Sequence, residues 1–170
     1  MRIVLAFASA LSLGALTLSA CASVQRLDAA NDVHALLVSI RDNDGAAFDA
    51  HVDHDALKRE FSAKLADRIG KDERMKGLAR LLGPSVIDFA DQALVQPKTF
   101  RTVAEQYGYR SDTKIPSAVA IAAALKPLPD GRVCATKTKD GPCVLTFTKE
   151  NGAWKLTSFD GDFSTLRLKL

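Results

Sequence analysis

The spacing of the apolar residues changes part way along this 170-residue chain. Over the first two thirds they recur every three or four positions, as on one face of a helix. From residue 132 onward, short segments alternate apolar and polar positions, which is typical of half-buried strands. Helical segments followed by strand segments predict an α+β fold. We expect four to six N-terminal helices, followed by a C-terminal antiparallel sheet of three to four strands.

Turn-forming residues separate the expected helices. Asn43-Asp44-Gly45 should end the first one, with Gly45 adopting a positive φ. Pro84 and Pro97 each occupy a first helical position, where proline is tolerated. The helices are expected at residues 29–40, 46–51, 57–69, 72–82, 84–94 and 97–107, and residues 117–125 are a further short candidate.

Three strands are expected at residues 132–138, 143–149 and 153–159, and 166–170 are a candidate fourth. Asn-Gly, found here at positions 151 and 152, is the dipeptide most typical of a two-residue hairpin turn. Such a turn pairs Phe147 with Leu156 and Lys149 with Trp154. It also puts four large apolar side chains on one face, which should meet the helices: Leu145, Phe147, Trp154 and Leu156.

The first twenty residues combine one positive charge with a long uncharged run. Arg2 precedes an apolar stretch from Ile3 to Ala20, and small residues close it. This order of features is typical of a secretory signal peptide. The alternative is a transmembrane anchor, for which 18 residues is near the minimum length.

Leu18-Ser19-Ala20-Cys21 resembles the lipobox of bacterial lipoproteins. The resemblance implies that a diacylglycerol is attached to the Cys21 sulfur and that the chain is cut before Cys21. We therefore expect a signal peptide (1–20), an acylated tether (21–26) and a single α+β domain (27–170). Ala22 stands where an Asp would imply retention at the inner membrane. The resemblance thus places the protein at the outer membrane, facing the periplasm, with membrane lipid as its first partner.

Two cysteines remain once Cys21 is acylated. Cys134 and Cys143 flank a turn predicted at Asp140-Gly141. Because the envelope outside the cytoplasm is oxidising, a disulfide between them is favoured over two reduced thiols. A metal site at this pair is disfavoured, since no third cysteine and no nearby histidine completes it.

Several short segments resemble the bacterial domain-of-unknown-function family 2939. They are residues 44–48, 52–58, 93–97 and 154–156, so the resemblance extends over about residues 27–160. The family carries no established activity. The resemblance therefore implies an exported, anchored domain and assigns no catalytic residue.

One cluster contains metal-ligand types: His51, Asp53, His54 and Asp55. Imidazoles and carboxylates are ligands for zinc or manganese. The alternative is structural. Asp53 would cap the following helix, and Val52 and Leu57 would form a hydrophobic staple across the cap.

The sequence contains no Gly-x-Ser-x-Gly, His-Glu-x-x-His, phosphate-binding-loop or dinucleotide-binding motif, so no catalytic residue is assigned and no cofactor is expected. The net charge of +3 is too small to indicate a nucleic-acid partner. Eight basic and four acidic residues mix over 58–80, which is typical of a solvated helix face or, alternatively, of a surface near anionic lipid. The leading hypothesis is a non-enzymatic envelope lipoprotein that binds a protein partner or an apolar ligand. One alternative is an envelope hydrolase, for which a metal at the histidine cluster is an option. Another is a purely structural or assembly protein at the outer membrane.

Overall fold

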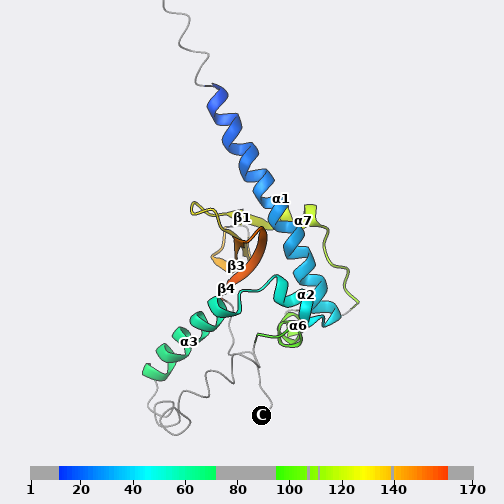
Figure 1. Ribbon diagram of the computed structural model, residues 1–170, viewed down its shortest axis with the longest axis vertical. Helices are drawn as coiled ribbons and strands as arrows, with labels where there is room; N and C mark the ends of the chain where they lie inside the picture. The colour runs from blue at the N-terminus through cyan, green and yellow to red at the C-terminus, as the bar shows by residue number, and fades with distance from the viewer. Residues whose placement is uncertain (1–11, 72–94, 107, 111, 139, 161–170) are drawn as a thin grey trace, which may run out of the picture.

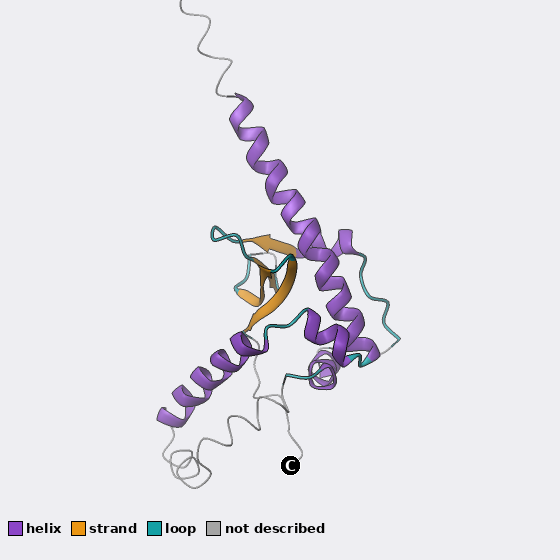
Figure 2. Ribbon diagram, in the orientation of Figure 1, coloured by secondary structure: helices purple, strands orange, loops and turns teal. Residues whose placement is uncertain are grey.

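The computed structural model describes residues 12–71, 95–106, 108–110, 112–138 and 140–160. Within these ranges, five helices are followed by a four-stranded antiparallel sheet, which confirms the α+β fold (Figures 1 and 2). The helices are α1 (Ser12–Asp42), α2 (Gly45–Ala50), α3 (His54–Lys71), α6 (Pro97–Gln106) and α7 (Ala118–Ala124). The strands are β1 (Leu125–Pro127), β2 (Val133–Thr136), β3 (Cys143–Glu150) and β4 (Ala153–Phe159). The helices expected at 72–82 and 84–94 and the strand at 166–170 lie outside the described residues.

Helix α1 is the longest element, and it contacts α2, α6, α7, β1 and β4 (Figure 1). Its buried face carries Ala29, Ala30, Val33 and Leu36, all within the helix expected at residues 29–40. The helix already includes residues 21–26, the segment expected to carry the acyl chains. Cys21, the position expected to carry the anchor, is therefore joined to the rest of the domain by continuous helix.

The end of α1 differs from the prediction. Asn43, not Gly45, has the positive φ, at 55°. Asn tolerates this conformation because its short polar side chain makes local hydrogen bonds. Asp44 then caps α2 by accepting a hydrogen bond from the Ala47 N–H at 3.1 Å, so Gly45 is helical.

The four strands form a meander in the order β1-β2-β3-β4. Phe147 pairs with Leu156 and Lys149 pairs with Trp154, which confirms the predicted hairpin register. Phe147, Trp154 and Leu156 are each at most 3% exposed and belong to one buried cluster with the helices. The expected sheet face is therefore the core face.

A β-bulge interrupts β4 after Leu156. Thr146 pairs with Ser158 while Phe147 pairs with Leu156, so Thr157 is an extra residue on β4. Its hydroxyl lies 2.9 Å from the Thr148 hydroxyl. An extra residue reverses the alternation of side chains. Phe159 is thereby turned inward, and it is only 8% exposed.

Strand β1 was not predicted. Leu125 was expected to be helical, but it caps α7 and pairs with Ala135. Three residues are too few to show a period, and Pro127 fits an edge strand because it cannot donate a ladder hydrogen bond.

Candidate functional site

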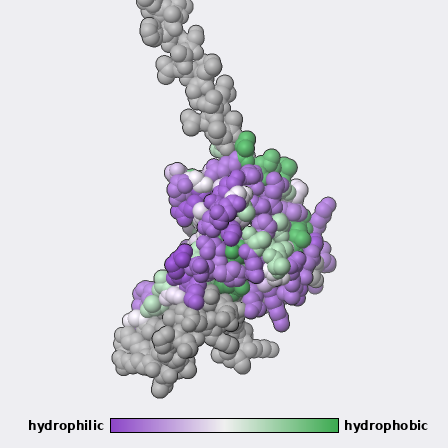
Figure 3. All heavy atoms as spheres, in the orientation of Figure 1, coloured by the Kyte–Doolittle hydropathy of each residue, from purple (hydrophilic) through white to green (hydrophobic). Residues whose placement is uncertain are grey.

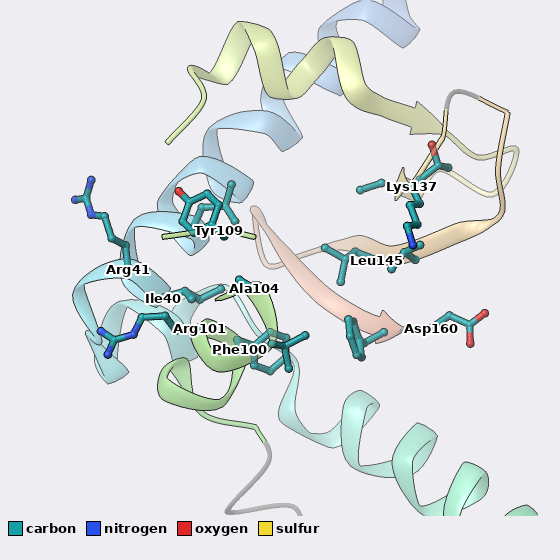
Figure 4. A pocket seen from close by; sticks show the side chains of 15 residues that line it. Ile40, Arg41, Phe100, Arg101, Ala104, Tyr109, Lys137, Leu145 and Asp160 are labelled. Carbon is teal, nitrogen blue, oxygen red and sulfur yellow. The ribbon is translucent and has the colours of Figure 1, made fainter. Parts of the chain in front are cut away.

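An apolar pocket of about 710 Å³ opens between the helices and the sheet (Figure 4). Helix α1 contributes Leu37 and Ile40, and α6 contributes Phe100 and Val103. The sheet contributes Leu145 and the inward-turned Phe159. The two layers thus meet around a space that is lined by hydrocarbon.

Aromatic rings form one wall of the pocket. The Phe100 ring lies 5.4 Å from the ring of Phe48 and 6.0 Å from that of Phe159, measured between centroids. Phe48 is fully buried on α2. Edge and tilted contacts of this kind stabilise aromatic clusters. This wall is therefore anchored in the core.

Charged side chains line the pocket beside this apolar surface. Arg41 is one of them, and in Figure 4 it points away from the cavity. It donates two hydrogen bonds to Asp42, at 2.7 and 2.9 Å. That pairing raises the pKa of Arg41 and lowers the pKa of Asp42. The remaining charged lining residues are Arg101, Lys137 and Asp160.

Helix α3 holds the end of β4 in place. The Lys64 ammonium donates to the Phe159 carbonyl oxygen at 2.8 Å and to Asp160 at 3.1 Å. The Phe159 N–H donates to the Glu60 carboxylate at 3.1 Å. Burial opposes the charge on Lys64, but its hydrogen bonds to Glu60 and Asp160 outweigh burial and raise its pKa. These bonds position the sheet side of the pocket.

The disulfide between Cys134 and Cys143 is formed, with the Cα atoms 5.6 Å apart. Cys134 is fully buried, and Thr136 and Lys137, which line the pocket, lie in the loop that the bond closes. The disulfide therefore restrains the part of the pocket wall that Thr136 and Lys137 form.

The residues of the candidate metal cluster contact different partners. His54 lies 2.9 Å from Asp49, and His51 lies 3.8 Å from Asp32. Asp53 accepts a hydrogen bond from the Ala56 N–H at 2.9 Å, as expected of a helix cap. Within the described ranges, no three His, Cys, Asp or Glu side chains converge on a possible metal position.

The backbone of the same segment has a structural role. The Asp53 N–H donates to the Leu156 carbonyl oxygen, and the Leu156 N–H donates to the His51 carbonyl oxygen. Val52 and Leu57 are both buried in the core cluster, as the hydrophobic staple predicts. Residues 51–53 thus extend the sheet along the free edge of β4.

Fold and site together define a two-layer α+β domain with an apolar pocket between its layers. Residues 10–103 match the family described as Protein of unknown function (DUF2939), and the chain belongs to that family. The match covers the segments at 44–48, 52–58 and 93–97, and it ends before the sheet, so the expected extent of 27–160 is only partly met. No curated protein and no solved structure matches the chain. Across the described residues, no helix is both long and apolar enough to cross a membrane.

Proposed function

We propose that this protein is a lipid-anchored envelope protein whose domain binds an apolar ligand in the pocket, without catalysing a reaction. The pocket between the helices and the sheet carries this proposal. Its volume of about 710 Å³ lies within the range of small-molecule sites. A cavity of this size that stayed empty would sacrifice packing contacts, whereas a ligand restores them.

The lining favours a ligand with a long apolar part. Seven of the lining side chains are large hydrocarbons, and they come from α1, α6 and the sheet. Each methylene group that moves from water into such surroundings contributes about 0.8 kcal/mol. Lys137 also lines the pocket and supplies a cation that suits an anionic end group, so an acyl chain with an anionic terminus fits both parts.

The anchor is proposed from the N-terminal sequence. Leu18-Ser19-Ala20-Cys21 supports acylation at Cys21, and Ala22 supports the outer membrane with the domain facing the periplasm. Two or three acyl chains hold a protein stably on a bilayer, whereas one chain is marginal. Replacing Cys21 by Ser should move the protein from the membrane fraction to the soluble fraction. Retention in the membrane after this change would contradict the anchor.

A substitution that fills the pocket with a large side chain tests the binding function. Ala104 lines the pocket from α6, and Thr102 is exposed on the same helix. Ala104→Phe should weaken the binding of dansyl-undecanoic acid about tenfold or more, which corresponds to about 1.4 kcal/mol. The matched control Thr102→Phe should bind the probe like the wild type. Equal affinity in both variants, or no binding to the wild type, would refute the proposal.

A further inference from the structure

Exposed apolar side chains gather near the anchor end of the domain. In the described ranges, three large hydrophobic side chains are exposed: Val24 (68%), Leu27 (46%) and Val119 (71%). Val24 and Leu27 lie on α1, and Val119 lies on α7, which packs against α1. Figure 3 shows hydrophobic surface at the end of the domain from which α1 emerges. We call these three side chains the anchor-end patch.

Helix α7 is apolar on its outer side as well. All seven of its residues are Ala, Val or Ile, yet only Ile121 is buried. Val119, Ala120, Ala123 and Ala124 are exposed. A helix that faces water normally presents polar residues on its outer side. The outer face of α7 therefore extends the anchor-end patch with further unpartnered apolar surface.

The patch begins close to Cys21, the expected lipidation site. Val24 follows Cys21 by three residues, and Leu27 follows Val24 by three, so successive positions are neighbours on the helix surface. Val24 lies only about 4.5 Å beyond Cys21 along the helix axis. Gln25 donates to the Gly131 carbonyl oxygen at 2.6 Å, which ties this part of α1 to the loop between β1 and β2.

We infer that the anchor-end patch rests on the bilayer that holds the lipidated Cys21, so that the domain has a fixed orientation on the membrane. This inference rests on the proposed anchor. After the proposed cleavage, Cys21 is the first residue of α1, and its acyl chains place this end of the helix at the lipid surface. The helical connection leaves the domain little freedom to turn away. Apolar side chains in this position enter the boundary between headgroups and acyl chains. Arg26, between Val24 and Leu27, is a cation of the kind that anionic headgroups attract.

The orientation has a consequence for the pocket. Leu37 and Ile40 follow Val24 by 13 and 16 residues, which places them about 20–24 Å farther along α1. The pocket then stands away from the membrane surface. A ligand would have to leave the bilayer, or arrive from the periplasm, in order to reach it.

The test uses tryptophan as a depth probe in the full, lipidated protein. Val119→Trp places the probe in the patch, and Lys98→Trp places a control on α6, where Lys98 is exposed. Trp154 is buried and contributes the same background to both variants. Each variant is reconstituted in vesicles of equal parts phosphatidylethanolamine and phosphatidylglycerol with dibrominated acyl chains. Quenching at position 119 should exceed quenching at position 98 by about twofold or more.

Equal quenching at the two positions, in protein that stays with the vesicles, would overturn the orientation and leave the anchor intact. Protein that stays soluble and shows no quenching at position 119 would refute both. An emission shift of Val119→Trp that depends on protein concentration without vesicles would instead assign the patch to a second copy of the chain. As a further check, Val24→Asp with Leu27→Asp should abolish the difference in quenching while Cys21 keeps the protein in the membrane fraction.

Discussion

The Lys64 ammonium on α3 lies 2.8 Å from the backbone carbonyl oxygen of Phe159, a residue 95 positions later in the chain. This contact joins a helix outside the pocket lining to the strand end that forms the pocket wall. Glu60, one turn earlier on α3, accepts from the Phe159 N–H and lies 2.6 Å from Lys64. The shape of the pocket therefore depends on two polar residues that do not line it.

Replacing Lys64 by Met should loosen the end of β4. The variant keeps much of the side-chain length and loses the charge-assisted hydrogen bonds. Because the ammonium is partly exposed, we expect the free energy of unfolding to fall by only about 1 kcal/mol. Urea unfolding measures this loss, and amide exchange at Phe159 should accelerate. Unchanged stability together with unchanged exchange would show that the contact does not hold the strand.

The contact between Asp28 and Trp154 predicts a pH dependence. The carboxylate accepts from the Trp154 indole at 2.8 Å and from Lys149 at 2.6 Å, and the Lys149 bond, followed by the Trp154 bond, lowers the Asp28 pKa below 3.8. Because folding lowers this pKa, the ionised Asp28 stabilises the folded state fully above pH 3.8. This stabilisation is lost as the pH falls through the lower pKa of the folded state. Asp28→Asn should therefore cost about 1 kcal/mol or less at pH 7, and less still in acid.

Lys149→Met provides the control for this prediction. It removes the interaction that lowers the Asp28 pKa most, so the acid dependence assigned to Asp28 should shrink although the carboxyl group remains. The measurement is the urea midpoint between pH 7 and about pH 3. If the wild type and Asp28→Asn lose stability in parallel over this range, Asp28 does not carry the predicted dependence.

The disulfide should stabilise the fold and the pocket wall together. Replacing Cys134 and Cys143 by Ala should lower the free energy of unfolding by about 2–3 kcal/mol, as the chain-entropy treatment of a short loop predicts. Affinity for the dansyl probe should also fall, because Thr136 and Lys137 lie within the closed loop. The reduced wild type should behave like the double variant. A wild-type urea midpoint that reduction does not move would contradict this role.

Asp53 distinguishes a helix cap from a metal ligand. Asp53→Ala removes the acceptor for the Ala56 N–H and should cost about 1 kcal/mol. Asp55→Asn, in the first turn of α3, should cost a few tenths, because it affects only the interaction with the helix dipole. Elemental analysis of the purified wild type gives the second readout. Stoichiometric zinc or manganese that is lost in Asp53→Ala would support the metal hypothesis and, with it, the hydrolase alternative.

The hairpin was predictable from the sequence because its determinants are local. Asn151-Gly152 sets the turn, and the alternation of large apolar residues sets the face, so the register of Phe147 and Leu156 follows. The bulge at Thr157 was not predictable. A regular continuation points Phe159 outward, and only packing against α3 and α6 favours the extra residue that turns it inward.

The pocket itself was beyond the reach of sequence patterns. Leu37 and Ile40 lie at helical spacing on α1, and Phe100 and Val103 lie at helical spacing on α6. Whether two apolar faces close on each other or leave a space depends on side-chain volumes across segments far apart in the chain. The helical spacing of apolar residues shows which faces are apolar. It does not show that a space remains between these faces in the folded protein.

The most direct test of the central claim is the native mass of the lipidated protein, purified gently from the envelope. The account predicts one bound acyl-chain ligand per chain, in addition to the acyl groups on Cys21, and an organic extract that contains it. Ala104→Phe should abolish the bound ligand, and Thr102→Phe should retain it. Wild-type protein that carries no ligand, and that does not take up dansyl-undecanoic acid when this is added, would contradict the assignment of the pocket as a binding site.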